Sequence, residues 1–157
     1  MRIACASDAH GAKDRLKRLI DALPRVDALC FLGDMEADGD LLEALLRERQ
    51  PKALFLQVAG NNDFATALPK TVETFLGETK VLITHGHLFQ VKRTMLPLLL
   101  RARERECALA LFGHTHAPLD LSQDGVRLVN PGALNKGEWA LIEIQGKVIV
   151  KMQTLPW

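Results

Sequence analysis

All five histidines of this chain lie in three short segments, Asp8-Ala9-His10, Thr84-His85-Gly86-His87 and Gly113-His114-Thr115-His116. Each segment directly follows an apolar run that reads as a strand. Neutral imidazoles and carboxylates form a mixed nitrogen and oxygen ligand set, which suits Mn²⁺, Fe, Zn²⁺ or Ni²⁺ and differs from the thiolates of structural zinc. The concentration of histidine therefore predicts metal chemistry.

Two further segments, Gly33-Asp34 and Gly60-Asn61-Asn62-Asp63, also follow apolar runs. If the strands are parallel neighbours, all these segments meet at one sheet edge, where open α/β sheets build their sites. The candidate ligands are Asp8, His10, Asp34, Asn61, His85, His114 and His116. This set has more ligands than one metal ion needs, but it is sufficient for two. Two cations about 3.5 to 4 Å apart lower the pKa of a bridging water and clamp a phosphoryl oxygen, which is a route to phosphoester hydrolysis.

Each segment also has a simpler interpretation. Asp8 with His10 fits a turn cap beside a surface imidazole, Gly33-Asp34 fits an ordinary strand exit, and residues 60–63 carry the Asn and Asp that favour turns. A His-x-His pattern that occurs twice, each time after an apolar strand, fits this interpretation poorly. The joint arrangement favours metal binding.

The first half of the chain alternates between strands and helices. Apolar runs at 3–6, 28–32 and 53–58 predict buried strands. The first helix has its apolar stripe at Leu16, Leu19, Ile20 and Leu23, and the second at Leu41, Leu42, Leu45 and Leu46. Asp40 is the expected N-cap of the second helix. This β-α-β-α-β order predicts a parallel sheet.

The second half predicts a hairpin, one helix and further strands. The hairpin spans 71–76 and 80–84, the helix 94–106, and the following strands 109–112, 119–121, 126–129, 140–144 and 148–152. Parallel strands followed by a meander indicate two packed sheets with helices outside. At 157 residues we expect a single domain over 1–157.

Composition is that of a soluble globular protein, with 48% hydrophobic and 25% charged residues. A net charge of +1 implies no obligatory nucleic-acid or membrane partner. No signal-peptide or membrane-spanning run is expected. Cys5, Cys30 and Cys107 are an odd number of thiols in apolar segments, as in a reducing compartment, so we expect a cytoplasmic protein.

The ordered set D-x-H, GD, GN-x-D, HGH and GHTH resembles the calcineurin-like metallophosphoesterases. The short length, the THGH segment and Asn130-Pro131-Gly132 are similar to the small single-domain phosphodiesterase branch, which shares a fold with the retromer scaffold subunit. The resemblance covers about residues 3–135. It implies a four-layer α/β/β/α sandwich of two mixed β-sheets flanked by helices.

The same resemblance implies a role for each ligand. Asp8, His10, Asp34 and His116 would hold the first metal, and Asp34 as the bridge, Asn61, His85 and His114 the second. The resemblance also implies that the metal is often Mn²⁺, with Ni²⁺, Fe²⁺, Zn²⁺ or Mg²⁺ as alternatives. A bridging hydroxide would then attack the phosphorus of a small phosphodiester.

The position after Asn61 departs from the family pattern. Many members carry His there and the small branch commonly carries Cys, but this chain has Asn62, whose amide is no general acid. Asn62 can still donate a hydrogen bond to a phosphoryl oxygen. His87 is the alternative acid, with Asp63 setting its tautomer, although His87 could equally serve to support His85. Ala133 also replaces a frequent serine.

Three function classes follow from these residues. The first is a binuclear metal-dependent phosphodiesterase, and the second a phosphomonoesterase or nucleotide pyrophosphohydrolase with the same centre. The third is a non-catalytic, retromer-like interaction scaffold, which would place no demand on ligand identity. The sequence leaves open the physiological substrate, the native metal and whether the chain forms a homo-oligomer.

Overall fold

The computed structural model describes residues 1–156; Trp157, whose packing the sequence left open, lies outside the described residues. The strands are β1 (Arg2–Ala6), β2 (Ala28–Phe31), β3 (Leu54–Gln57), β4 (Thr71–Leu76), β5 (Thr79–Thr84), β6 (Leu109–Leu111), β7 (Leu119–Gln123), β8 (Val126–Asn130), β9 (Glu138–Ile144) and β10 (Val148–Thr154). The helices are α1 (Lys13–Ala22), α2 (Glu36–Arg49) and α3 (Leu96–Glu104), with short 3-10 turns η1 (His87–Phe89) and η2 (Leu134–Lys136).

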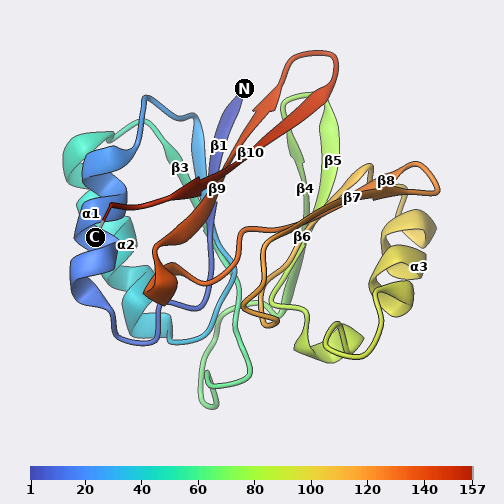
Figure 1. Cartoon of the computed structure of the whole chain (residues 1–157), viewed down its shortest axis with the longest axis horizontal. Helices are drawn as coiled ribbons and strands as arrows, with labels where there is room; N and C mark the ends of the chain where they lie inside the picture. Colours follow the sequence, from blue (N-terminus) through green and yellow to red (C-terminus); the bar gives the residue numbers. More distant parts are fainter. Residues whose placement is uncertain (157) are drawn as a thin grey trace.

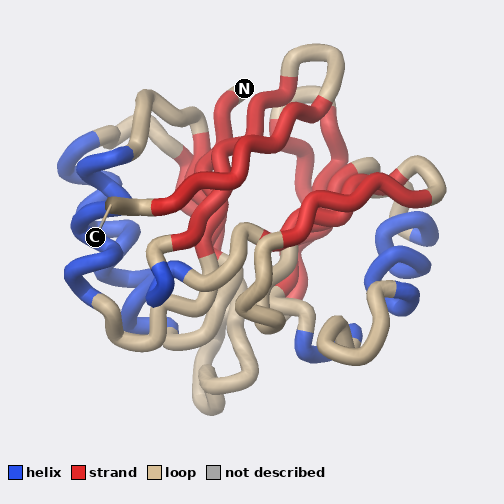
Figure 2. The backbone as a smooth tube through the Cα atoms, in the orientation of Figure 1, coloured by secondary structure: helices blue, strands red, loops and turns tan. Residues whose placement is uncertain are grey.

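The strands form two five-stranded sheets, ordered β10-β9-β1-β2-β3 and β4-β5-β6-β8-β7. Strands β1, β2 and β3 run parallel to one another, as do β5, β6 and β8. The other strands pair antiparallel, so both sheets are mixed. Figure 2 shows the two sheets facing each other, with helices on their outer sides.

Three apolar layers hold this arrangement together. One lies between α1 and α2 and the first sheet, a second between the two sheets, and a third between the second sheet and α3. Side chains along β1 alternate between two of these layers, because successive residues of a strand point to opposite faces of the sheet. Ile3 and Cys5 face the central layer, whereas Ala4 and Ala6 face the helices. The predicted four-layer α/β/β/α sandwich is confirmed.

The late strand series is divided between the sheets. Strands β7 and β8 complete the second sheet, whereas β9 and β10 join the first, where β9 pairs with β1. Both faces of β9 are apolar, since Trp139 packs under the helices while Ala140 and Ile142 enter the central layer. A strand buried on both faces needs an interior position, which the place beside β1 provides.

All three cysteines are buried and free, as the sequence predicted. Cys5 and Cys30 are register partners on β1 and β2, within the central layer. Within residues 1–156, no helix has the length and apolar character needed to cross a membrane.

Helix α2 begins earlier than predicted, at Glu36, so the assignment of Asp40 as its N-cap is wrong. The residue before the helix, Met35, has a left-handed backbone and no capping side chain of its own. The cap comes instead from Asp63, whose Oδ1 accepts hydrogen bonds from the N–H groups of Met35 (3.1 Å) and Glu36 (2.7 Å). A cap supplied by a residue so distant in sequence cannot be recognised from the local pattern.

We therefore expect Asp63→Ala to lower the free energy of unfolding by about 1 to 2 kcal/mol, because it leaves these N–H groups without their acceptor. Asp40→Ala is the matched control. It removes an exposed carboxylate within the same helix and should change stability by less than about 0.5 kcal/mol. Urea unfolding of both variants measures the difference, and equal destabilisation would contradict the capping role of Asp63.

Candidate metal centre

The five segments singled out in the sequence meet at one edge of the molecule. They follow β1, β2, β3, β5 and β6, which all end at the lower edge in Figure 1. Within each sheet these strands are parallel, so their carboxyl ends lie side by side. The first sheet therefore contributes Asp8, His10, Asp34 and Asn61, and the second contributes His85, His87, His114 and His116.

One group of ligand atoms surrounds Asp8 and His116. Asp8 Oδ1 lies 3.0 Å from His116 Nε2 and 3.7 Å from His10 Nε2. The two imidazoles approach each other to 3.2 Å between their Nε2 atoms. Asp34 Oδ2 lies 3.9 Å from His10 Nε2. The ligand atoms of Asp8, His10 and His116 all fall within 4.8 Å of one another, a spacing that suits a shared cation.

A second group forms around His85. Its Nε2 lies 3.1 Å from Asn61 Oδ1, 3.7 Å from Asp34 Oδ1 and 3.9 Å from Asp8 Oδ1. Its Nδ1 faces the carbonyl of Leu32 at 2.7 Å, which leaves Nε2 to point toward the carboxylates. The ring of His114 lies edge-on to that of His85, with centroids 5.0 Å apart. Sequence reasoning placed Asp8 in the first group alone, but Asp8 Oδ1 borders both groups.

The carboxylate of Asp8 is fully buried and only one of its oxygens is satisfied. Oδ2 accepts hydrogen bonds from Ser7 Oγ (2.6 Å) and from the backbone N–H of His114 (3.0 Å). Oδ1 is buried and accepts no hydrogen bond in the described part of the chain, and the imidazole of His116, with Nε2 at 3.0 Å, would compensate its charge only when protonated. A buried charged oxygen is costly unless a cation or donor compensates it, so the residues present fit a metal ion. Sequence reasoning missed Ser7, whose signal was a hydroxyl directly before a candidate ligand.

The backbone of this edge is held in an uncommon conformation. Asp8, His10, Asp34, His114 and His116 have φ between 49° and 68°, in the left-handed region that non-glycine residues rarely adopt. Such strain persists where surrounding contacts enforce it, and it clusters at functional sites. Five predicted ligands thus share a backbone feature that the sequence did not reveal.

Two glycines allow the close approach of these loops. A Cβ on Gly60 would collide with the backbone and the carboxylate of Asp34. A Cβ on Gly113 would collide with Ser7 Oγ and crowd Asp8 Oδ2. Both glycines therefore bring a loop directly against a predicted carboxylate ligand, one across β2 and β3 and the other between the two sheets.

Asn62 contacts the predicted bridging carboxylate through two hydrogen bonds. Its backbone N–H donates to Asp34 Oδ1 and its Nδ2 donates to Asp34 Oδ2, each at 2.9 Å. The side chain is exposed, and Nδ2 carries a second hydrogen. Asn62 thus fixes Asp34 and retains one donor beside it.

His87 lies next to this centre, with its ring centroid 5.4 Å from that of His85. Its Nδ1 is buried and has no hydrogen-bond partner among residues 1–156. The expected hydrogen bond to Asp63 is not formed, because the Asp63 carboxylate accepts from the N–H groups of Met35, Glu36 and Gly60 instead. Burial and the nearby His85 lower the pKa of His87.

His114 is affected in the same way, since burial and the neighbouring His85 lower its pKa to about 4. Both His87 and His114 are therefore neutral at pH 7, and a neutral imidazole is the form that binds metals. Lys70 further lowers the pKa of His87, and Lys92 that of His114.

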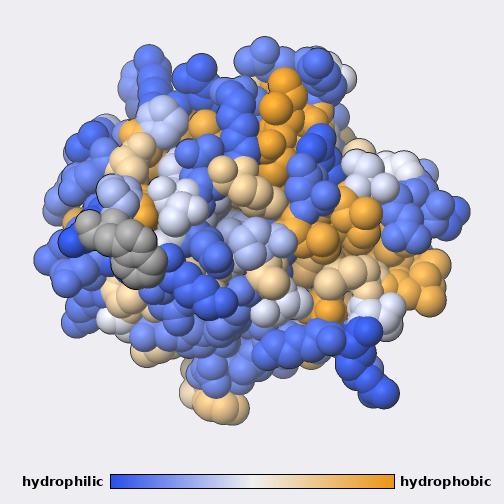
Figure 3. Space-filling model, in the orientation of Figure 1, coloured by the Kyte–Doolittle hydropathy of each residue, from blue (hydrophilic) through white to orange (hydrophobic). Residues whose placement is uncertain are grey.

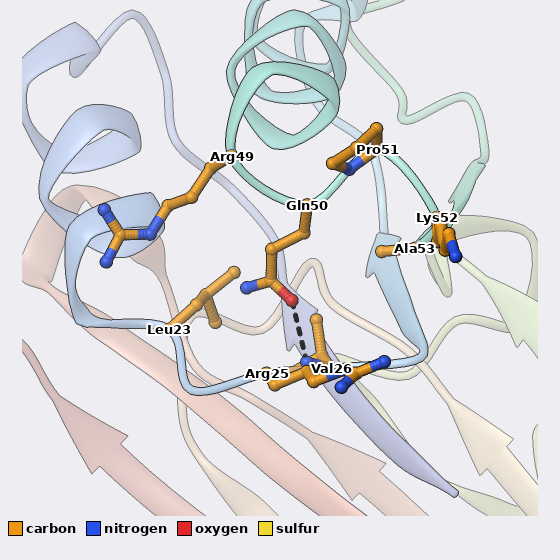
Figure 4. A pocket seen from close by; sticks show the side chains of 8 residues that line it. All are labelled: Leu23, Arg25, Val26, Arg49, Gln50, Pro51, Lys52 and Ala53. Atoms are coloured by element: carbon orange, nitrogen blue, oxygen red, sulfur yellow. Dashed lines mark hydrogen bonds between the residues drawn. The ribbon is translucent and has the colours of Figure 1, made fainter.

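A separate pocket of about 500 Å³ lies at the opposite edge of the first sheet, where β2 and β3 begin. Val26 is among the residues that line it, and its N–H donates to Gln50 Oε1 (2.9 Å, dashed in Figure 4). Arg25, Arg49 and Lys52 line it near the carboxyl ends of α1 and α2, where cations interact favourably with the helix dipole. No predicted metal ligand lines this pocket.

A family model described as the calcineurin-like phosphoesterase superfamily domain matches residues 1–152. A probable metallophosphoesterase of Bacillus subtilis, YsnB, is 32% identical over 135 residues, covering 85% of this chain and 75% of that protein. The crystal structure of a predicted phosphoesterase from Streptococcus pneumoniae superposes with a TM-score of 0.80 at 30% identity, covering 98% of this chain and 88% of the other.

Two more distant structures share the fold. An archaeal phosphodiesterase superposes with a TM-score of 0.79 at 19% identity, over 99% of this chain and 100% of its own. Vps29 from Entamoeba histolytica, solved in complex with Zn²⁺, superposes with a TM-score of 0.72 at 20% identity, over 98% and 99% of the two chains.

The orphaned oxygen of Asp8 leads to a prediction about metal binding. Adding Mn²⁺ to chelator-treated protein should raise the melting temperature, because a ligand at 100 times its Kd stabilises the folded state by about 2.7 kcal/mol. Asp8→Asn should remove most of this shift, since it deletes the charge that borders both ligand groups. Asp14→Asn, an exposed change in the first turn of α1, is the control and should keep the full shift. A full Mn²⁺ shift in Asp8→Asn would exclude Asp8 as a ligand.

Proposed function

The chain belongs to the calcineurin-like phosphoesterase superfamily, and we propose that it is a binuclear metal-dependent phosphodiesterase. The observation that carries this proposal is the buried Asp8 Oδ1, which lacks a hydrogen-bond partner and lies between two groups of ligand atoms. Every ligand type that the chemistry needs is present at this edge. An interaction scaffold would place no demand on the identity of these ligands, so the complete set favours the enzyme.

The proposed ligands divide between two positions. Asp8, His10, Asp34 and His116 would hold one divalent cation, and Asp34, Asn61, His85 and His114 the other, with Asp8 bordering both. When bound, two such cations lower the pKa of water and neutralise charge on phosphoryl oxygens. We propose Mn²⁺ as the metal because the family resemblance implies it, and the mixed carboxylate and imidazole set is compatible with it. The Zn²⁺ complex of Vps29 makes zinc the first alternative to test.

The remaining residues of the site are suited to bind the phosphate and steady its charge. Lys70 and Lys92, whose charges act on His87 and His114, would attract an anionic substrate. The second Nδ2 hydrogen of Asn62 would donate to a phosphoryl oxygen, while the first keeps Asp34 in place. Both contributions are electrostatic, so they do not depend on a particular base or sugar.

Departure of the leaving group requires a proton or a hydrogen bond on the leaving oxygen. Asn62 is no acid, and the lowered pKa of His87 keeps its imidazole neutral near pH 7. A neutral imidazole N–H is a weak acid, though it can still donate a hydrogen bond to a developing alkoxide. We therefore propose that His87 assists poor leaving groups and that turnover is fastest on diesters with good ones, such as aryl esters.

The enzyme is tested with chelated protein before and after Mn²⁺ is added, using bis-p-nitrophenyl phosphate and p-nitrophenyl phosphate in parallel. Activity should vanish on chelation, return with Mn²⁺ and favour the diester. Asp34→Asn should lower kcat at least about 100-fold, because one carboxylate contacts both ligand groups, whereas Asp40→Asn on α2 should match the parent.

Other results of this assay have definite meanings. A preference for p-nitrophenyl phosphate would establish a phosphomonoesterase instead. Two bound metals without activity on either substrate would favour the scaffold role, for which the shared fold with Vps29 is the supporting observation. Near-normal turnover by Asp34→Asn would exclude the two-metal assignment.

His87→Ala tests the role of that imidazole. If His87 assists the leaving group, the variant should lose about 100-fold in kcat on a diester with an alkyl leaving group, yet less than about threefold on bis-p-nitrophenyl phosphate. The metal content of the variant serves as the control, because support of His85 alone would lower metal occupancy and both rates together. Unchanged rates on both esters would rule out His87 as the acid.

A further inference from the structure

A loop with an uncharged tip projects from the edge that carries the proposed metal centre. It follows β3, and its base is closed by a hydrogen bond from Ala59 N–H to the carbonyl of Pro69 (2.9 Å). In Figure 1 it is the green loop that extends below the rest of the molecule. Its tip reads Phe64-Ala65-Thr66-Ala67, without a charged side chain. Compact surface loops with joined ends are frequently functional.

Phe64 is the most solvent-exposed large apolar side chain among residues 1–156, at 90%. The other exposed phenylalanine, Phe75 on β4, is 66% exposed, and the exposed leucines lie between 37% and 54%. In Figure 3 the projecting tip is apolar surface set against a mostly hydrophilic lower edge. An aromatic ring left so open to water forgoes the stabilisation that burial would give it, unless a ligand covers it.

The loop is anchored to the proposed centre directly before Phe64. Asn62 donates two hydrogen bonds to Asp34, and the Asp63 carboxylate accepts three from Gly60, Met35 and Glu36. Consecutive Cα atoms are about 3.8 Å apart, so the Cα of Phe64 lies within about 7 Å of that of Asn62. A phosphate held at Asp34 would therefore have Phe64 within the reach of one nucleoside.

We propose that Phe64 is a stacking platform for a nucleobase, which makes nucleotidyl diesters the substrate class of this site. This inference rests on the proposed phosphodiesterase function and specifies it. Stacking on an aromatic face tolerates every base, because each has a π-face, and it is worth about 10-fold in affinity. The uncharged tip fits this role, since it would attract a base without repelling the phosphate that follows it.

Equilibrium binding measurements separate the contribution of the base to affinity from that of the phosphate. The dissociation constants of AMP and ribose 5-phosphate are measured by calorimetry on Mn²⁺-loaded protein, because the two ligands differ only by the base. The parent should bind AMP about 10-fold more tightly. Phe64→Ala should erase this difference by weakening AMP alone, whereas Phe64→Trp should keep it.

Phe75→Ala is the matched control, since it removes the other exposed phenylalanine from β4, and it should leave both constants unchanged. Equal affinities in the parent, no detectable binding of either ligand, or an undiminished preference for AMP in Phe64→Ala would overturn the proposal. Diester hydrolysis is followed separately. If the protein hydrolyses diesters but binds AMP no more tightly than ribose 5-phosphate, the stacking role of Phe64 is refuted and the phosphodiesterase function stands. If it binds AMP more tightly through Phe64 but hydrolyses no diester, the stacking role stands and the phosphodiesterase function is refuted.

Discussion

The edge that carries the candidate metal centre depends on one constraint, which is the burial of two carboxylates close to several imidazoles. Asp8 and Asp34 are almost fully buried, and like charges so placed repel one another unless donors or cations compensate them. The chain compensates part of the charge with Ser7, Asn62 and the N–H of His114. The negative charge that these donors do not compensate, above all that on Asp8 Oδ1, is available to a cation.

Because the ligands come from both sheets, the layer between the sheets sets the distances at the centre. Residues of β1 and β2 face those of β5 and β6 across this layer, so its packing fixes how closely His85 approaches Asp34. Because protein interiors are close-packed, a small change in the volume of a side chain in this layer is transmitted as strain. Leu32 links the two directly, because its side chain packs in this layer and its carbonyl faces His85 Nδ1 at 2.7 Å.

The segment after β3 connects fold and function most directly. Asp63 caps α2, Asn62 fixes Asp34, and Phe64 extends from the same turn into solvent. A single short loop thus stabilises a helix, orients a predicted ligand and offers an aromatic surface. It also gives the amide of Asn62 a role at the position where the family resemblance implies an acid, because Asn62 acts there as a hydrogen-bond donor to a carboxylate.

The sequence by itself determined which residues could bind metal, since ligand type is local chemistry, and it determined the strands and helices, since apolar periodicity is local too. It also indicated two packed sheets. Only the tertiary structure decided that β9 lies beside β1, that Asp63 caps α2 rather than orienting His87, and that Asp8 borders both ligand groups. These outcomes depend on contacts between residues far apart in the chain, whose partners become neighbours only when the two sheets pack.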